Sequence, residues 1–191
     1  DYSHPASLTS LLEYCMSTGT PVVFATTGYS DEQVAQIKKA SSNIPVFFSW
    51  NMSLGINLLK KKKKKATAIL GNQFDIEIIE KHHNQKIDAP SGTALMIANA
   101  INETRNDDLK YTYDRHSQRK KRDQNEIGIH AVRGGTIVGI HEVLFAGNDE
   151  TITISHSAAS KTVFAEGSIN AAIYICGRSA GLYDMGNIVS Q

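Results

Sequence analysis

The sequence predicts an α/β protein in which part of a doubly wound parallel sheet is followed by an α+β domain with an open, mostly antiparallel sheet. Two observations predict this fold class. Helical patterns and short apolar runs alternate along residues 1–50, which is the order of elements in a Rossmann-like sheet. From residue 74 onward, apolar and polar residues alternate in segments separated by glycine-containing turns, as in antiparallel strands.

The elements of the first part follow in order. The apolar spacing of residues 5–16 predicts a helix, and the apolar run 21–25 predicts a buried parallel strand. Ser30 and Gln33 have the spacing of a capping box, so a second helix is expected to begin there. The apolar run 44–48 predicts a second buried strand.

The glycine-rich turn that opens a dinucleotide-binding sheet does not occur in the sequence. There is no G-x-G-x-x-G segment, and the first expected element is already a helix. Two interpretations stay open: the domain never bound a dinucleotide, or the chain begins partway through a Rossmann unit. Periodicity alone does not choose between them.

A helix is expected over residues 53–70, and it contains six consecutive lysines, Lys60 to Lys65. Such a run does not supply an apolar stripe at helical spacing. We therefore expect a solvated segment or a local anomaly of sequence. A phosphate-binding patch is the alternative.

The second part begins with a strand at residues 74–80 and continues with a helix at 91–103. Residues 110–122 are polar and basic and are expected to form a surface loop. Three further strands are expected, joined by turns at Gly134-Gly135 and at 147–149, so that they form an antiparallel meander. These strands are expected at residues 127–132, 136–145 and 150–156.

A last helix is expected at residues 161–176, ended by Gly177. The expected domains are 1–52, the remainder of a dinucleotide-binding domain; 53–163, a substrate-binding and oligomerisation domain; and 164–191, a helix and tail that return to the first. An open sheet has edges that need cover, so self-association through it is expected.

Composition excludes several classes of protein. The formal net charge of +1 gives the whole chain no electrostatic bias towards nucleic acid or membranes. No apolar run is long enough to span a bilayer, and no signal peptide is seen, which fits a cytoplasmic protein. The two cysteines, Cys15 and Cys176, are expected to be buried free thiols.

One loop is rich in groups that move protons or bind anions. His82, His83 and Lys86 follow the strand at 74–80. Just after them, the Ser91-Gly92-Thr93 segment begins a helix, where unpaired backbone N–H groups attract an anion such as a carboxylate. The loop therefore predicts proton transfer on a small, negatively charged substrate.

The same loop carries a resemblance to a known family. The segment Glu80-x-His82-His83-x-x-Lys86-x-Asp88-Ala89-Pro90-Ser91-Gly92-Thr93-Ala94 resembles the signature of the dihydrodipicolinate reductases, also called 4-hydroxy-tetrahydrodipicolinate reductases. Shorter matches occur in the family's order and extend the similarity over essentially the whole chain. They are Ala25-Thr26-Thr27-Gly28, Asn51-Met52-Ser53-x-Gly55, the segment 132–139 and the segment 181–185.

The resemblance implies an oxidoreductase of lysine and diaminopimelate biosynthesis. A nicotinamide cofactor, NADH or NADPH, gives a hydride to a cyclic unsaturated dicarboxylate, with loss of water. By motif position His82 is the proton donor and acceptor and Lys86 a second proton donor, while His83, Ser91, Gly92 and Thr93 bind the substrate. The implied cofactor-binding residues are Ala25, Thr26, Thr27, Ser49, Trp50, Asn51 and Met52.

The resemblance also implies a cytoplasmic homotetramer that uses no metal, membrane or nucleic acid. The chain departs from the family pattern in lacking the N-terminal glycine-rich part of the Rossmann domain, in its lysine run, and at Ser157, where many members have a basic residue. An alternative for the chain as given is a truncated, catalytically impaired oligomerisation and substrate-binding module.

Two other classes of function fit the sequence less well. A nucleic-acid binder would use Lys60 to Lys65 and the loop from Arg115 to Arg122, but the net charge is near zero and no stacking aromatics adjoin the lysines. A zinc hydrolase centred on His82 and His83 would need a third ligand at sensible spacing, which the sequence does not offer.

Overall fold

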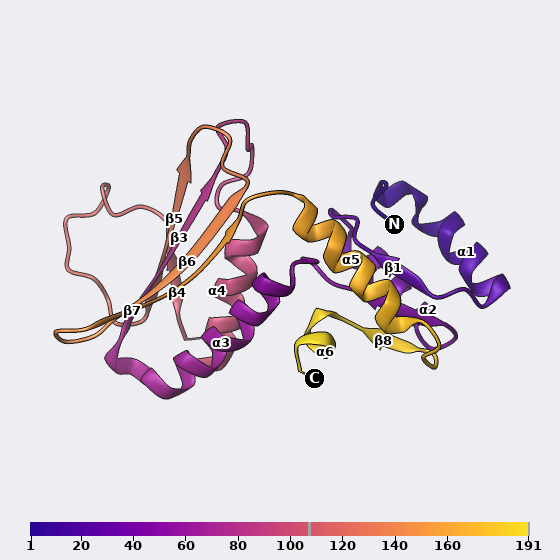
Figure 1. Cartoon of the computed structure of the whole chain (residues 1–191). Coiled ribbons are helices and arrows are strands. Elements are labelled where there is room, and N and C mark those ends of the chain that lie inside the picture. The colour runs from indigo at the N-terminus through magenta and orange to yellow at the C-terminus, as the bar shows by residue number, and fades with distance from the viewer. Residues whose placement is uncertain (107, 191) are drawn as a thin grey trace. The chain divides into compact units, whose positions relative to one another are not determined.

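The computed structural model describes residues 1–106 and 108–190 and shows an α/β chain divided into two compact units (Figure 1). The first unit combines Asp1–Asn57 with Thr162–Gln191, and the second is Leu58–Lys161. The expected fold class is confirmed, because one sheet is wholly parallel and the other is mixed.

The first unit is built on a parallel sheet of three strands in the order β1-β2-β8. The strands are β1 (Val22–Phe24), β2 (Pro45–Phe48) and β8 (Gly181–Tyr183), and every neighbouring pair is parallel. Successive side chains of a strand point to opposite faces, so apolar runs such as that of β2 bury both faces at once.

Helices bury residues from each face of this sheet in a separate core. One core joins Phe24 and Phe48 to α1 (Leu8–Thr18) and α2 (Asp31–Ala40), and the capping box that begins α2 is present as predicted. The other core joins Phe47 to two further helices, α5 (Thr162–Ile175) and α6 (Met185–Val189). Helix α1 is shorter at its start than predicted, because Pro5–Ser7 form a 3₁₀ turn, η1.

The second unit is built on a sheet of five strands in the order β4-β5-β3-β6-β7. Strand β3 lies between β5, to which it is parallel, and β6, to which it is antiparallel, and β6 pairs with β7 as a hairpin. The bounds are β3 (Asp75–His82), β4 (Lys110–Thr112), β5 (Glu126–Arg133), β6 (Gly139–Ala146) and β7 (Thr151–Ala158).

The predicted meander of the last three strands is therefore wrong for its first pair. Strands β5 and β6 are not neighbours, because their connection crosses the carboxyl end of β3 instead of folding back tightly. Gly134 N donates to the His82 carbonyl at 2.9 Å, and Asn84 N donates to the Gly135 carbonyl at 3.2 Å. The crossing fixes the backbone on both sides of His82.

Two helices of the second unit pack on one face of its sheet (Figure 1). They are α3 (Leu54–Leu70), which begins in the first unit and is followed by the 3₁₀ turn η2 (Gly71–Gln73), and α4 (Gly92–Thr104). Every second residue of β3 is buried, beginning at Ile76.

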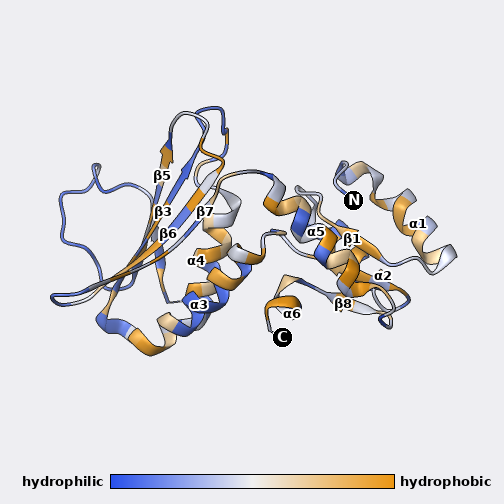
Figure 2. Ribbon diagram, viewed as in Figure 1, coloured by the Kyte–Doolittle hydropathy of each residue, from blue (hydrophilic) through white to orange (hydrophobic). Residues whose placement is uncertain are grey.

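The predicted surface loop at residues 110–122 needs a correction at its start. Lys110–Thr112 form β4, paired parallel with β5, because the buried Leu109 draws the chain against the sheet. The remainder is a loop, and Figure 2 shows that it is almost wholly hydrophilic.

The lysine run is solvated only in part. Lys61, Lys62 and Lys65 are exposed, whereas Lys63 is 1% exposed. Lys63 follows Ile56 and Leu59 on the buried stripe of α3 and occupies a position where an apolar residue would be expected. The expectation of a solvated run is wrong for this one residue.

The cysteines are both free, as predicted, but only Cys15 is buried and Cys176 is exposed. None of the helices in the described part of the chain is long and apolar enough to cross a membrane.

Candidate functional site

In the first unit, the residues expected to bind the cofactor follow the carboxyl ends of two adjacent parallel strands. Phe24 and Phe48, the last residues of β1 and β2, are register partners. The segments 25–27 and 49–52 therefore leave the sheet side by side, at the edge where nucleotides bind to doubly wound sheets.

The first of these segments presents little side-chain surface beyond Thr27, which is exposed. Ala25 packs against the core formed with α5 and α6. Thr26 is buried, and its hydroxyl donates to the Asp1 carboxylate at 2.9 Å. A ligand at this edge would therefore meet Thr27 and the backbone of the segment.

In the second segment, Trp50 is the most prominent side chain. It is 57% exposed and stands edge-on to the Phe48 ring, with centroids 5.2 Å apart. Ser49 Oγ donates to the Asn51 carbonyl at 3.1 Å, and Asn51 Oδ1 accepts from Ser53 N at 2.8 Å, so both residues brace the turn. Met52 is buried in the core and cannot offer its side chain to a ligand.

In the second unit, His82 forms a buried pair with Glu80. Both side chains leave the buried face of β3, and His82 Nδ1 lies 2.6 Å from Glu80 Oε2. An ionised carboxylate only accepts hydrogen bonds, so Nδ1 carries the hydrogen and Nε2 is left to exchange a proton with a ligand.

Glu80 is held ionised by three groups. Burial acts to raise the pKa of this carboxyl, but hydrogen bonds from Arg133, from His82 and from the Ser91 amide outweigh it and lower the pKa. Arg133 binds both oxygens, at 2.7 and 2.8 Å, and Ser91 N donates to Oε1 at 3.0 Å. One carboxylate thereby joins the end of β5, the His82 imidazole and the start of α4.

His82 Nε2 has a close neighbour in the β6 backbone. A Cβ built on Gly139 would lie 3.2 Å from this nitrogen, closer than most real Cβ contacts. A glycine at position 139 therefore leaves space beside the proton-exchanging atom.

Lys86 is joined to a carboxylate of its own loop. Its Nζ donates to Asp88 Oδ1 at 2.6 Å. The Lys86 hydrogen bond is the largest influence lowering the pKa of Asp88, and the backbone amide of Gly92 acts on it in the same direction. The Asp88 carboxylate thus lies where a lysine and the first amide of α4 both attract an anion.

Helix α4 begins where the sequence predicts a helix start, and Ser91 is its N-cap. Ser91 Oγ accepts from Ala94 N at 3.1 Å, while the amides of Gly92 and Thr93 lie in the first turn. A Cβ on Gly92 would meet no atom within 4 Å, so its backbone is open to a ligand. His83 follows β3 directly and is half-buried.

Sequence reasoning missed His141 as a site residue. This buried side chain of β6 shares a hydrogen bond of 3.0 Å between its Nε2 and Ser91 Oγ, and its ring stands edge-on to His82 with centroids 5.1 Å apart. Burial lowers its pKa to about 3, helped by the charges on His82 and Lys63, so the ring is neutral near pH 7. Its position opposite Glu80 in the β3–β6 register was beyond sequence reasoning, because that pairing was not predicted.

Glu80 and Arg133 were recognised only as parts of longer motifs. Their signal was weak because they lie 53 residues apart and meet only through the parallel pairing of β3 with β5.

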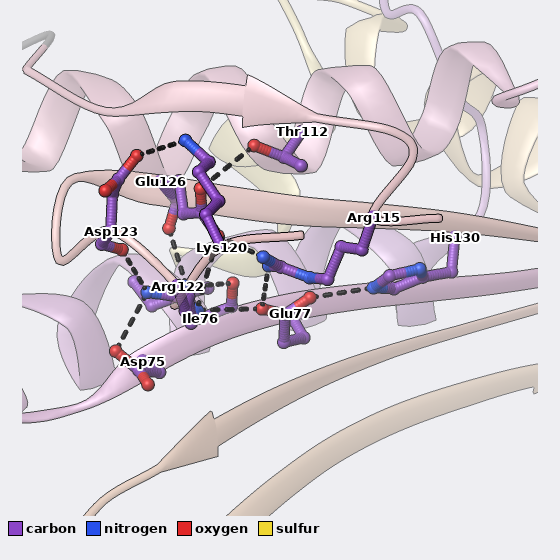
Figure 3. A network of polar contacts seen from close by, with 10 residues as sticks. All are labelled: Asp75, Ile76, Glu77, Thr112, Arg115, Lys120, Arg122, Asp123, Glu126 and His130. Atoms are coloured by element: carbon purple, nitrogen blue, oxygen red, sulfur yellow. Dashed lines mark hydrogen bonds and ion pairs between the residues drawn. The ribbon is translucent and has the colours of Figure 1, made fainter. Parts of the chain in front are cut away.

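Arg115, Lys120 and Arg122 of the basic loop after β4 form ion pairs within the chain (Figure 3). Arg115 bonds both Glu77 and Glu126, and Arg122 bonds Glu77 at 3.0 Å and Asp75 at 2.8 Å. His130 Nε2 lies 2.7 Å from Glu77 as well. These guanidinium groups fasten the loop to the sheet, which argues against their use as a nucleic-acid patch.

Within residues 1–106 and 108–190, no group of three His, Cys, Asp or Glu side chains is placed to hold a metal ion.

Comparison with known proteins identifies relatives for the whole chain. The family models described as "Dihydrodipicolinate reductase, N-terminus" and "Dihydrodipicolinate reductase, C-terminus" match residues 1–52 and 55–189. The chain is 51% identical over 191 residues to the 4-hydroxy-tetrahydrodipicolinate reductase of Clostridium novyi (strain NT), covering all of this chain and 75% of the relative. It is 48% identical over 188 residues to the enzyme of that name from Staphylococcus epidermidis, covering 98% and 77%.

A solved structure is also similar: the dipicolinate-bound dihydrodipicolinate reductase from Paenisporosarcina sp. TG-14, with a TM-score of 0.76 and 30% identity. The match covers 98% of this chain and 72% of that one. The chain thus spans about three quarters of the length of these relatives.

Proposed function

The chain belongs to the dihydrodipicolinate reductase family, and from this premise we propose that it reduces 4-hydroxy-tetrahydrodipicolinate to tetrahydrodipicolinate with NADH or NADPH. It is an oxidoreductase of the pathway to diaminopimelate and lysine. The observation that carries the residue-level proposal is the buried Glu80–His82 pair, tied by the Ser91 amide to the start of α4.

We propose that the start of α4 and Lys86 bind a substrate carboxylate. Lys86 and the Gly92 amide already act on one carboxylate, that of Asp88. A dicarboxylate would compete with Asp88 for these groups, and the open space around Gly92 admits it. Thr93, in the same turn, and His83, which directly follows β3, complete the proposed contacts.

His82 gives the proton with which the substrate hydroxyl leaves as water. The imidazolium gives this proton from Nε2, and the Glu80 carboxylate stabilises the charged ring through Nδ1. Lys86, in the same loop, is the second proton donor: it returns a proton to the ring carbon from which His82 accepts one when water leaves, so that one proton is taken up in all. The His141 ring beside His82 is neutral.

The proposed cofactor site is the edge formed by segments 25–27 and 49–52. The residues fit a dinucleotide, since the segments leave adjacent parallel strands and expose Thr27 and the Trp50 indole. A bound nicotinamide would supply the hydride. Trp50, Ser49 and the backbone at 25–27 would hold it, while Met52 supports the turn from the core.

A homotetramer in the cytoplasm is proposed on family grounds and on the uncovered face of the second sheet. Ile79, Ile140 and Leu144 lie on the face opposite α3 and α4 and are only partly buried. A second copy would cover this apolar surface. Light scattering of the purified protein would give its mass.

Turnover and ligand binding together test the proposal. The purified chain should bind dipicolinate in calorimetry and oxidise NADH or NADPH in the presence of freshly made 4-hydroxy-tetrahydrodipicolinate. His82→Gln should slow turnover by about 100-fold with little loss of dipicolinate affinity. Binding without turnover in the unaltered chain would favour the substrate-binding module, and absence of both would contradict the proposal.

A further inference from the structure

Lys63 is a buried cation that the proposed reaction does not use. It lies on the sheet-facing side of α3 with 1% of its surface exposed, and its Nζ makes no hydrogen bond to any described residue. No carboxylate appears among the influences on its pKa, which burial alone lowers to about 7. Charged or neutral, the amine keeps hydrogens to donate and needs an acceptor.

Two of the other buried polar atoms that lack a hydrogen-bond partner are relevant to Lys63. Thr67 stands one helical turn after Lys63 on the same side of α3, and its Oγ1 has no hydrogen-bond partner among the described residues. The same is true of Nδ1 of His141, on β6. His141 and His156 are register partners on β6 and β7, and the Lys63 charge lowers the pKa of both, so the amine is close enough to act on this strand pair.

Lys63 Nζ, Thr67 Oγ1 and His141 Nδ1 are thus three buried polar atoms without a protein partner in the described part of the chain. Buried polar groups without a protein partner are ordinarily satisfied by an internal water that makes two to four hydrogen bonds. A water adds no second buried charge, whereas a halide ion would have to be desolvated together with the ammonium.

We propose that Lys63 is a positioning residue: with Thr67 it holds a water that donates to His141 Nδ1 and so fixes the His141 hydrogen on Nε2. The inference rests on the proposed function only for the identity of the ligand at α4. The remaining polar neighbours of the His141 ring are His82 and Glu80 on β3, His156 on β7 and Ser91 before α4.

The His141 tautomer affects the start of α4, where an anion is proposed to bind, through the hydrogen bond between His141 and Ser91. With its hydrogen on Nε2, His141 donates to Ser91 Oγ, which also accepts from Ala94 N. Both lone pairs of the hydroxyl are then engaged, and its own hydrogen is left to donate. The hydroxyl that caps α4 thereby becomes a donor for a substrate carboxylate. With the opposite tautomer, it would donate to His141 instead.

The test combines nitrogen NMR of the histidine rings with dipicolinate titration. The unaltered chain should show neutral His141 as the Nε2–H tautomer. In Lys63→Met, which keeps an unbranched side chain as far as Cε and removes the amine, both tautomers should appear and dipicolinate affinity should fall by about five-fold. Lys62→Met, exposed on the same helix, should change neither.

Thr67→Val gives a second perturbation that leaves the lysine in place, and it should shift the tautomer balance in the same direction. An Nδ1–H tautomer in the unaltered chain would overturn the proposal and would indicate an anion, in place of the water, between Lys63 and His141. A His141 signal unchanged by Lys63→Met would overturn it as well. Failure of the unaltered chain to bind dipicolinate would instead contradict the proposed function, because the tautomer is read without ligand.

Discussion

Glu80 and His82 leave the same face of β3, two residues apart, and the carboxylate accepts the imidazole Nδ1 hydrogen at 2.6 Å. The spacing follows from the two-residue period of a strand. Arg133 is the third group of this network. It binds both carboxylate oxygens and keeps the fully buried Glu80 ionised, so that Glu80 can accept the hydrogen of His82 Nδ1. The orientation of His82 is therefore set by a network, and each member can be tested.

Glu80→Gln should lower kcat by about 100-fold, because the amide cannot stabilise a charged imidazole as a carboxylate does. Arg133 would also lose its ion pair, so the melting temperature should fall. Glu142→Gln is the matched control, since its partner Lys81 lies 3.0 Å away in a more exposed ion pair. Equal activity of the two variants, measured by oxidation of the reduced cofactor, would contradict the role given to Glu80.

Gly139→Ala should impair turnover without unfolding the protein. The new methyl group would lie 3.2 Å from His82 Nε2 and crowd the atom that exchanges the proton. Gly134→Ala is a suitable control, because a Cβ there meets nothing within 4 Å. We expect kcat to fall about ten-fold for the first variant and to stay unchanged for the second. A fully active Gly139→Ala enzyme would show that Nε2 does not act in that space.

Asp88→Asn should strengthen dipicolinate binding. The native carboxylate holds Lys86 at 2.6 Å, and its pKa is lowered first by that lysine, so it stays ionised well below its usual range and competes with a ligand. Removing the charge should lower the dissociation constant by about three-fold, measured by calorimetry. Asp149→Asn, in the β6–β7 turn, should have no effect. Weaker binding by Asp88→Asn would mean that Asp88 supports the ligand instead of competing with it.

Local elements were predictable from the sequence because their causes are local. Three examples depend on residues only a few positions apart: the capping box at Ser30 and Gln33, the apolar run that forms β2, and the helix start at Ser91. The order of strands in the second sheet was not predictable in this way. A glycine pair such as Gly134-Gly135 occurs both in tight hairpin turns and in wider connections. Here the connection is the wider one because β3 pairs with both β5 and β6 and so lies between them.

The site was predictable to the same extent. His82, Lys86 and the start of α4 lie in one continuous segment, so their proximity needs no tertiary information. His141 comes from another strand and was found only in the structure, and the ion pair of Arg133 with Glu80 was likewise seen only there. Lys63 was misjudged because a charge run is usually solvated, whereas the packing of α3 forces one of its members inward.

The burial of Lys63 should make the free energy of unfolding depend on pH between about 7 and 10.5. Its pKa falls from 10.5 to about 7 on folding because burial disfavours the charged amine. Between these values the unfolded chain binds more protons than the folded one, so the free energy of unfolding rises with pH across this window. Lys63→Met removes the effect and should be more stable near pH 7 by a few kcal/mol, an advantage that shrinks as pH approaches about 10. Denaturant unfolding of both proteins at the two pH values, with Lys62→Met as control, measures it. A difference that stays constant with pH would show that folding does not lower the pKa of Lys63, because stability changes with pH only where the folded and unfolded chains bind different numbers of protons.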